Sequence, residues 1–263
     1  MNEPKLILEN LHYWRGDKKI LNGVNWTVRQ GEQWAVLGRN GSGKTTLMMI
    51  ATGYVPSSLG RVFLVEGWQG ELALQETRKK VGLVSSTLSD HLVRWRDTTT
   101  GLEIVLSGLD AMLGPYRRFD RTRAEEGRAL LKRLGGEHLA DCIFKTMSSG
   151  ERQTCLIARC YTAQSELIIL DEPCAGLDFV NRERLLSTID SGCREHPNIP
   201  QVLITHHPEE IVPGITHVLM IREGSVVAQG PKEETLNEEN LTKTYGIPLK
   251  AVHRDGRVWI LPS

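Results

Sequence analysis

The apolar and polar positions divide the chain into a strand-rich start, a helical middle and a remainder in which strands and helices alternate. Residues 5–14 and 20–31 alternate apolar and polar side chains around a polar turn, which predicts two paired strands. A mostly apolar run at residues 32–38 predicts a third strand. Residues 44–53 predict a helix that ends at Gly53, because glycine readily adopts the left-handed conformation that closes many helices.

Between residues 98 and 139 the pattern becomes helical. Thr100–Glu103 and Thr122–Glu125 each place a threonine three residues before a glutamate, which is the spacing of a capping box at a helix start. Apolar residues follow the first box at helical spacing: Leu102, Val105, Leu106, Leu109 and Leu113. Gly135-Gly136 then provides a stop signal. We therefore expect a small helical subdomain inserted into an α/β core.

After this segment the α/β pattern resumes. A helix at 150–163, a buried strand at 166–170, another helix and a strand at 201–205 follow in turn. The last segment alternates around Asp255-Gly256, a dipeptide that favours a tight hairpin turn. No segment is repeated, so we expect one domain: a core of residues 1–86 and 146–263 with the helical subdomain at 87–145.

Composition and charge narrow the class of protein. Lys plus Arg equals Asp plus Glu, at 32 each, which argues against a dedicated nucleic-acid binder. No apolar run reaches the 18 or more residues that would cross a bilayer, and the first ten residues lack the pattern of a signal peptide. The five cysteines include no C-x-x-C pair, so we interpret them as reduced thiols and not as metal ligands. We expect a cytoplasmic protein without a direct nucleic-acid partner.

The strongest chemical signal is a glycine-rich loop between the third strand and the first helix. Residues 38–45 fit G-x-x-x-x-G-K-[ST] in full, in the strand–loop–helix setting that this pattern requires. The glycines let backbone N–H groups point at phosphate oxygens, Lys44 adds a positive charge, and the Thr45 hydroxyl is placed to ligate Mg²⁺. The expected phosphate-binding residues are Gly38, Arg39, Asn40, Gly41, Ser42, Gly43, Lys44, Thr45 and Thr46.

Two further strands end in polar chemistry. The buried run at 167–170 ends in the adjacent carboxylates Asp171 and Glu172, which are costly to bury together unless a cation or a proton is present. We expect Asp171 to hold Mg²⁺ through water and Glu172 to orient an attacking water; the alternative is a solvated strand end. The strand at 201–205 is followed by two histidines, of which we favour His206 over His207 as functional.

Ligands of open parallel sheets collect beyond the carboxyl ends of the strands. Gly38, Asp171 and His206 each follow such a strand, so we expect them to converge on one edge of the sheet.

The segment MSSGERQ, residues 147–153, begins the helix that precedes the Asp171 strand. Together with GRNGSGKT, ILDEP, AGLD and THH, in this order, it makes the chain resemble an ATP-binding-cassette (ABC) ATPase over essentially its whole length. The resemblance implies an α/β fold with a RecA-like P-loop NTPase core, an N-terminal antiparallel β subdomain and an inserted α-helical subdomain. It also implies ATP and Mg²⁺ as cofactors.

In this family the MSSGERQ position is a signature that faces the γ-phosphate held by a second copy. The resemblance therefore implies a head-to-tail dimer with two ATP molecules between the copies. It assigns the signature to Ser148, Ser149, Gly150 and Glu151, and we interpret the first three as a helix start with free N–H groups. The segment differs from the usual LSGGQ at Met147, Ser149 and Glu151. Asp178 would cross the dimer interface, His206 would contact the γ-phosphate and Glu172 would be the catalytic base.

Two positions depart from the family pattern. The aromatic residue that usually stacks on adenine aligns with Arg15. Tyr13 and Trp14 are the candidates to take its place, and we favour Trp14; the alternative is that both pack in the sheet. The glutamine that usually contacts Mg²⁺ and relays the nucleotide state to a membrane partner is Ser86 here. Because a serine side chain is shorter than a glutamine, we expect either a water that bridges the gap at Ser86 or looser coupling between the nucleotide and the membrane partner at this point.

Residues 100–121 and 240–261 are most similar to ATPase subunits of metal-chelate importers and of a branch named after molybdate transport. We therefore expect a motor subunit that lies on the cytoplasmic face of the membrane through a permease on a separate chain, and that powers import of a metal chelate or oxyanion. The basic residues Arg117, Arg118, Arg121 and Arg123 form a solvated face or help to dock a partner. The alternative function is a soluble ABC ATPase that acts in DNA repair or on ribosomes. A phosphotransferase would leave MSSGERQ unexplained.

Overall fold

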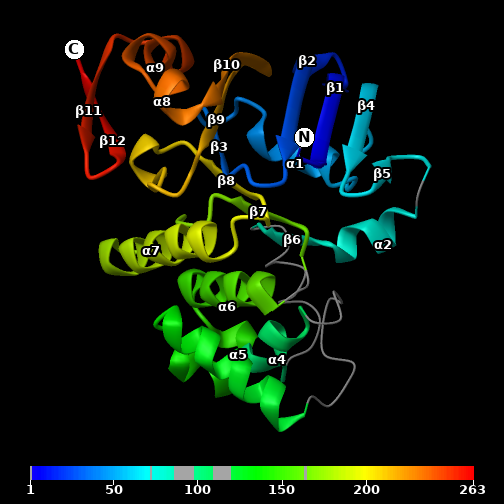
Figure 1. Cartoon of the computed structure of the whole chain (residues 1–263), viewed down its shortest axis with the longest axis vertical. Coiled ribbons are helices and arrows are strands. Elements are labelled where there is room, and N and C mark those ends of the chain that lie inside the picture. Colours follow the sequence, from blue (N-terminus) through cyan, green and yellow to red (C-terminus); the bar gives the residue numbers. More distant parts are fainter. Residues whose placement is uncertain (1, 72, 86–97, 109–119, 163–164) are drawn as a thin grey trace. The chain divides into compact units, whose positions relative to one another are not determined.

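The computed structural model describes residues 2–71, 73–85, 98–108, 120–162 and 165–263 (Figure 1). Its contacts divide the chain into two compact units, one of residues 1–77 with 190–263 and the other of residues 78–189. Several predicted positions lie outside the described residues: Ser86, Leu109, Leu113, Arg117 and Arg118. The predicted boundaries of the helical subdomain stay a prediction.

The first unit contains the predicted N-terminal antiparallel sheet. Strands β1 (Pro4–Arg15) and β2 (Lys18–Arg29) pair across the polar turn, and the sheet continues through β4 (Leu59–Leu64) and β5 (Gly67–Trp68) in the order β2-β1-β4-β5. Alternate apolar residues of β1 and β2 are buried, including Leu8 and Trp26, which explains the period of two in the sequence.

A second set of strands in this unit carries the chemistry. Strand β3 (Trp34–Leu37) runs parallel to both β8 (Gln201–Thr205) and β9 (His217–Arg222), and β10 (Ser225–Pro231) is antiparallel to β9. Every residue of β3 and β8 is buried, because parallel strands are covered on both faces. Their continuous apolar runs follow from that burial.

The other described elements of the first unit are helices, one short 3₁₀ helix and a hairpin: α1 (Lys44–Ala51), η3 (Pro208–Glu210), α8 (Lys232–Thr235), α9 (Glu238–Tyr245), β11 (Leu249–Arg254) and β12 (Arg257–Pro262). Asp255 and Gly256 both have positive φ, 51° and 73°, as a tight hairpin turn requires. The predicted closing hairpin is therefore confirmed.

The second unit combines a parallel strand pair with a group of helices. Strands β6 (Val81–Val84) and β7 (Leu167–Asp171) pair in parallel. Helices α4, α5 and α6 contact one another, as the green helices of Figure 1 show. The helical elements are α4 (Gly101–Leu106), α5 (Arg121–Arg133), α6 (Ser149–Thr162) and the short 3₁₀ helices η1 (Glu137–Asp141) and η2 (Phe144–Thr146). The chain passes between the units within α2 (Leu74–Lys79) and α7 (Phe179–Glu195).

One of the two predicted capping boxes is confirmed and the other is wrong. The Thr100 hydroxyl accepts from the Glu103 N–H at 3.3 Å, and the Glu103 carboxylate accepts from the Thr100 N–H at 2.8 Å. At α5, however, Asp120 is the N-cap and accepts from the Arg123 N–H at 2.9 Å. Thr122 lies inside the helix, because the aspartate two residues earlier satisfies the exposed N–H and starts the helix sooner.

No helix within the described ranges is long and apolar enough to cross a membrane. All five cysteines are described and none forms a disulfide.

Candidate nucleotide-binding and catalytic sites

The phosphate loop joins β3 to α1 in the first unit. Gly41 and Gly43 have φ values of 78° and 102°, which only glycine adopts readily, and Gly43 caps the N-terminus of α1 without a side-chain hydrogen bond. The Lys44 ammonium donates to the carbonyls of Gly38 at 2.8 Å and Arg39 at 3.1 Å, so it folds back over the loop. Arg39, Asn40, Gly41 and Thr45 are exposed, and Thr46 is half-buried.

The interior of the loop fits a phosphate group. The Ser42 hydroxyl is buried and has no hydrogen-bond partner in the described structure. A Cβ on Gly38 would lie 2.8 Å from that hydroxyl and 2.3 Å from the carbonyl oxygen of Ile221, so only glycine leaves the space open. A buried polar atom without a partner is costly, and a phosphate oxygen would satisfy it. The uncapped helix start points the same way, since it attracts anions.

The turn between β9 and β10 contacts the phosphate loop, which the sequence patterns did not indicate. Glu223 and Gly224, between β9 and β10, both have positive φ, and the Gly224 N–H donates to the Ser42 carbonyl at 3.0 Å. The Gly224 carbonyl accepts from the Asn22 N–H at 2.9 Å. Of this Glu-Gly dipeptide, only the glycine was a signal for a turn between the two strands. Nothing in the local pattern indicated that this turn contacts the phosphate loop.

His206 follows β8 at the same sheet edge as the phosphate loop. Leu37 pairs with Thr205 in the parallel register, so Gly38 and His206 leave neighbouring strands together. This part of the predicted convergence is confirmed. Asp171 belongs to the second unit, and its place in the convergence stays a prediction. The His206 ring lies against that of His207, with centroids 4.0 Å apart, and His207 Nδ1 is 3.2 Å from the Glu209 carboxylate.

The two candidate adenine platforms lie on β1. The Trp14 ring stacks on the His12 ring, with centroids 5.6 Å apart and planes within 6°, and its backbone N–H donates to Ser58. Trp14 pairs with Lys19, the residue before Ile20, whose carbonyl lies 3.1 Å from where a Cβ on Gly43 would be. Strand pairing therefore brings Trp14 near the phosphate loop. Tyr13 is half-buried, and the choice between the two aromatics stays a prediction.

Asp171 and Glu172 mark the end of β7 in the second unit, and both are half-buried. Glu172 has a φ of 49°, although it is not glycine and does not belong to a hairpin turn. Such a conformation costs energy, and strained backbone of this kind clusters at functional sites. The turn after it is held by the Ala175 N–H, which donates to the Glu172 carbonyl at 3.1 Å. This geometry supports a functional role of Glu172 over a plain solvated strand end.

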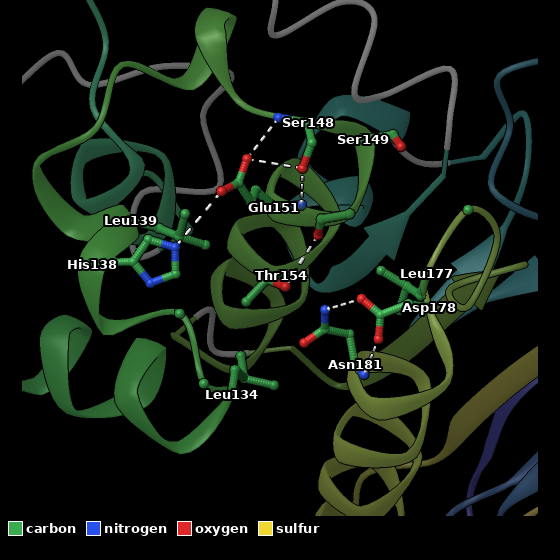
Figure 2. Close-up of a pocket in the computed structure, with 14 residues that line it drawn as sticks. Leu134, His138, Leu139, Ser148, Ser149, Glu151, Thr154, Leu177, Asp178 and Asn181 are labelled. Carbon is green, nitrogen blue, oxygen red and sulfur yellow. Dashed lines mark hydrogen bonds and ion pairs between the residues drawn. The ribbon is translucent and has the colours of Figure 1, made fainter.

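The signature residues begin α6 and line a pocket of about 300 Å³, shown in Figure 2. The Glu151 carboxylate accepts from the Ser148 N–H at 2.7 Å and from the Ser148 hydroxyl at 2.8 Å. Its other oxygen lies 3.6 Å from His138 Nε2. These two donations from Ser148 lower the pKa of Glu151. The prediction of a free N–H group is therefore wrong for Ser148, which forms a capping box with Glu151. The N–H groups of Ser149 and Gly150 lie in the first turn of α6, where a helix offers them no backbone acceptor.

Asp178 lies across the same pocket from the signature (Figure 2). Its carboxylate accepts from the backbone N–H of Asn181 at 2.9 Å and from the Asn181 side-chain amide at 2.7 Å, so it caps α7. These bonds lower the pKa of Asp178. The segment before it packs on the signature, since a Cβ on Gly150 would lie 2.7 Å from Leu177 Cδ2. A role of Asp178 across a dimer interface stays a prediction.

Comparison with known proteins decides the family. The profile of the ABC transporter family matches residues 21–175, which include the phosphate loop, the signature and both β7 carboxylates. The chain belongs to the ABC transporter family. It is an ATP-binding subunit of this family and an ATPase, and the resemblance drawn from its motifs is confirmed.

Curated ABC relatives match along almost the whole chain. An uncharacterised ABC transporter ATP-binding protein of Bacillus subtilis, YlmA, is 37% identical, and the match covers 97% of this chain and 96% of that protein. A Streptococcus mutans protein assigned as an ABC transporter ATP-binding protein is 36% identical, with 97% and 98% covered. The manganese transport system ATP-binding protein MntB of Bacillus subtilis is 28% identical, with 91% of each chain covered.

Solved ABC structures share the fold. An inward-facing ABC transporter assigned to the metal-chelate type matches with a TM-score of 0.75 and 24% identity, covering 99% of this chain and 98% of that one. The protein cbiO1 of Clostridium perfringens, part of the ABC transporter complex cbiONQ, matches with a TM-score of 0.72 and 26% identity, covering 92% and 94%. The predicted fold class, a P-loop NTPase core with an antiparallel β subdomain, is confirmed.

Proposed function

We propose that two copies of this chain close head to tail around two ATP molecules and power a separate membrane permease. The division of charge between the sites supports this arrangement. The phosphate loop carries Lys44, whereas no Lys or Arg lines the described pocket of the signature. Each copy thus supplies a cationic half-site and a half-site that has helix N–H groups but no cation. The buried Ser42 hydroxyl without a partner is the observation that carries the phosphate assignment.

In the proposed reaction Glu172 acts as the general base. It accepts a proton from a water whose oxygen attacks the γ-phosphorus, while the bond from that phosphorus to the bridging β-oxygen breaks and ADP leaves with the electron pair. His206 donates a hydrogen bond to a γ-phosphate oxygen, Lys44 neutralises charge on the phosphates, and Trp14 stacks on adenine. From the second copy, Ser148, Ser149 and Gly150 complete the contacts to the γ-phosphate.

Mg²⁺ would be held by the Thr45 hydroxyl and, through water, by the Asp171 carboxylate. Oxygen ligands of this kind suit Mg²⁺, which keeps several waters and joins protein carboxylates to substrate phosphates. The ion supplies charge neutralisation on the phosphate oxygens. Thr45 is exposed at the start of α1 and Asp171 ends β7, so neither is enclosed within the core of its own unit.

We further infer that the permease imports a metal, a metal chelate or an oxyanion and that the chain lies at the cytoplasmic face of the membrane. Support comes from MntB, a relative named for manganese transport, and from cbiO1, which is part of a transporter complex. Purifying the tagged chain from membranes tests this inference. Recovery with an integral membrane protein is the expected result, and recovery with ribosomes or DNA instead would support the alternative function.

The decisive test of the chemistry is Glu172→Gln. ATP binding should persist, hydrolysis should fall about 10²–10⁴-fold, and dimers should accumulate with ATP, because the variant lacks only the proton acceptor. Glu166→Gln is a matched control, since Glu166 precedes the same strand and pairs with Lys80 at 3.2 Å. Steady-state phosphate release and size-exclusion chromatography with ATP measure both effects. Turnover of Glu172→Gln close to that of the control would refute the assignment.

A further inference from the structure

The loop that carries His206 is held by the C-terminal part of the first unit. The Tyr245 hydroxyl, at the end of α9, donates to the His206 carbonyl at 2.7 Å. Arg257 Nε, at the start of β12, donates to the Glu209 carbonyl at 2.6 Å. The two donors follow their acceptors by 39 and 48 residues of sequence, and both bind backbone oxygens that come after the end of β8.

These contacts replace the sheet hydrogen bonds that stop at Thr205. Inside the loop, the Thr205 hydroxyl donates to the buried Glu210 carboxylate, and the His207 N–H donates to the Thr205 hydroxyl at 3.0 Å. The peptide unit between His206 and His207 is then fixed on one side by Thr205 and on the other by Tyr245. Because a peptide unit is planar, holding its N–H and its carbonyl fixes the position of the His206 Cα. Strand β8, which ends at Thr205, holds the chain on the other side of this Cα, and the two constraints together set the direction of the His206 side chain.

The tyrosine itself is firmly anchored. Thr244, the residue before it, is fully buried, and its hydroxyl lies 3.4 Å from Met220 Sδ on β9. Arg222, at the end of β9, donates to the Lys243 carbonyl at 2.8 Å. Strand β9 pairs with β3, which leads into the phosphate loop. Desolvation, with Glu209 and Glu210 nearby, raises the pKa of Tyr245, so its hydroxyl stays a donor throughout the working range of pH.

We propose that Tyr245 is a positioning residue for His206: its hydroxyl fixes the His206 carbonyl and thereby aims the imidazole across the sheet edge toward the phosphate loop. This inference rests on the proposed function, in which His206 contacts the γ-phosphate. In this role Tyr245 acts through the His206 carbonyl and not through a contact with ATP. Through this hydrogen bond the His206 backbone is held by α9. Helix α9 is itself held by β9, the strand that pairs with β3.

Tyr245→Phe removes one oxygen and keeps the ring. We expect kcat for ATP hydrolysis to fall roughly two- to twelvefold with little change in KM, because a single hydrogen bond contributes about 0.5–1.5 kcal/mol and each 1.36 kcal/mol is about tenfold in rate. The histidine is needed after ATP binds, which is why the effect falls on kcat. Tyr54→Phe is the matched control, since it removes the same oxygen from a half-exposed tyrosine of the same unit, and it should keep wild-type kcat.

A double-mutant cycle separates positioning from general destabilisation. In a His206→Gln background, Tyr245→Phe should change kcat by less than about twofold, because residues that act through one another are not additive. An equal loss in both backgrounds would overturn the inference. So would wild-type kcat in Tyr245→Phe while His206→Gln is impaired, an outcome that leaves the proposed function standing.

A measurement independent of turnover completes the test. In protein labelled at histidine Cε1, the NMR signal that is lost in His206→Gln should shift in Tyr245→Phe and stay in place in Tyr54→Phe. An unmoved signal would overturn the inference even if both variants were inactive. Wild-type turnover in His206→Gln would overturn it as well, and the proposed function would then be judged on Glu172→Gln alone.

Discussion

Gly224 lies outside every motif, yet its substitution should damage both stability and nucleotide binding. Its φ is 77°, and its backbone joins the β9–β10 turn to the phosphate loop through Ser42 and to β2 through Asn22. A Cβ at this position would lie 2.1 Å from the carbonyl oxygen of Ile20 and 2.8 Å from its carbonyl carbon. Both neighbours are backbone atoms of a paired strand, so neither can rotate away as a side chain could.

Two costs add for Gly224→Ala. Placing a residue with a Cβ in the left-handed region costs about 1–2 kcal/mol. Forcing extra volume into a packed site costs a further 1–3 kcal/mol, roughly. The total of about 2–5 kcal/mol is a large share of the 5–15 kcal/mol that typically stabilises a folded protein. Gly16→Ala isolates the first cost, since Gly16 has a φ of 59° and a Cβ there would have no atom within 4 Å.

Urea unfolding of both variants measures the difference. Gly224→Ala should lose about 1–3 kcal/mol more than Gly16→Ala, the steric part alone. Nucleotide titration at low urea gives a second result: affinity should fall in Gly224→Ala, because the turn can no longer hold the Ser42 carbonyl, and stay unchanged in Gly16→Ala. Equal loss of stability in the two variants, or wild-type affinity in Gly224→Ala, would refute the reasoning.

Three further predictions concern local structure. Asp120→Ala should cost about 1 kcal/mol of stability, whereas Thr122→Ala should cost much less, because only Asp120 caps α5; urea midpoints compare them, and the reverse order would contradict the cap assignment. The pKa of Glu151 is lowered, so its contribution to stability is present above its ordinary value of 4.5 and lost as the pH falls through the lowered one. In urea unfolding at pH 7, the wild type should have a higher free energy of unfolding than Glu151→Gln, and this difference should shrink below pH 4.5. A difference that stays constant with pH would contradict the prediction. Burial raises the pKa of Cys155, Cys160 and Cys193 to about 12, so a thiol reagent at pH 8 should label exposed Cys142 first, and rapid labelling of the other three would show that they are accessible.

Sequence patterns predicted the elements well where the deciding interactions are local. The capping box of Thr100 and Glu103 and the hairpin turn at Asp255-Gly256 involve residues within four positions of each other. The prediction of the start of α5 was wrong because two residues that cap helices well, Asp120 and Thr122, stand two positions apart. Glu125 lies three residues after Thr122, so the spacing favoured Thr122 as the cap. In the structure Glu125 pairs with Arg121 at 2.9 Å instead, so the pattern was present but its partner was different.

The supports of the site could not be predicted in this way. Gly224 contacts Ile20 across about two hundred residues of sequence, and Tyr245 binds the carbonyl of His206 across 39. A motif describes groups that touch the ligand, which must keep their spacing because the ligand has a fixed shape. Supporting residues need only reach a backbone atom, and many residue types in many places can do so. No spacing rule identifies them until the fold is known.

The signature shows why a folding signal and a functional signal can be the same residues. A helix start needs its first N–H groups satisfied, and Ser148 and Glu151 meet that need with their own side chains. In the proposed dimer the γ-phosphate approaches this same helix start.

The Ser148 hydroxyl has one hydrogen to donate, and it already donates that hydrogen to Glu151. To bind phosphate it must release the carboxylate, which keeps its bond from the Ser148 N–H. Closure at this point therefore exchanges one hydrogen bond for another, and its net gain is smaller than that of a hydroxyl without a partner. Glu151 thus satisfies the helix start in the separate copy, and the Ser148 hydroxyl becomes a donor for an ATP molecule of the second copy only after it releases this carboxylate.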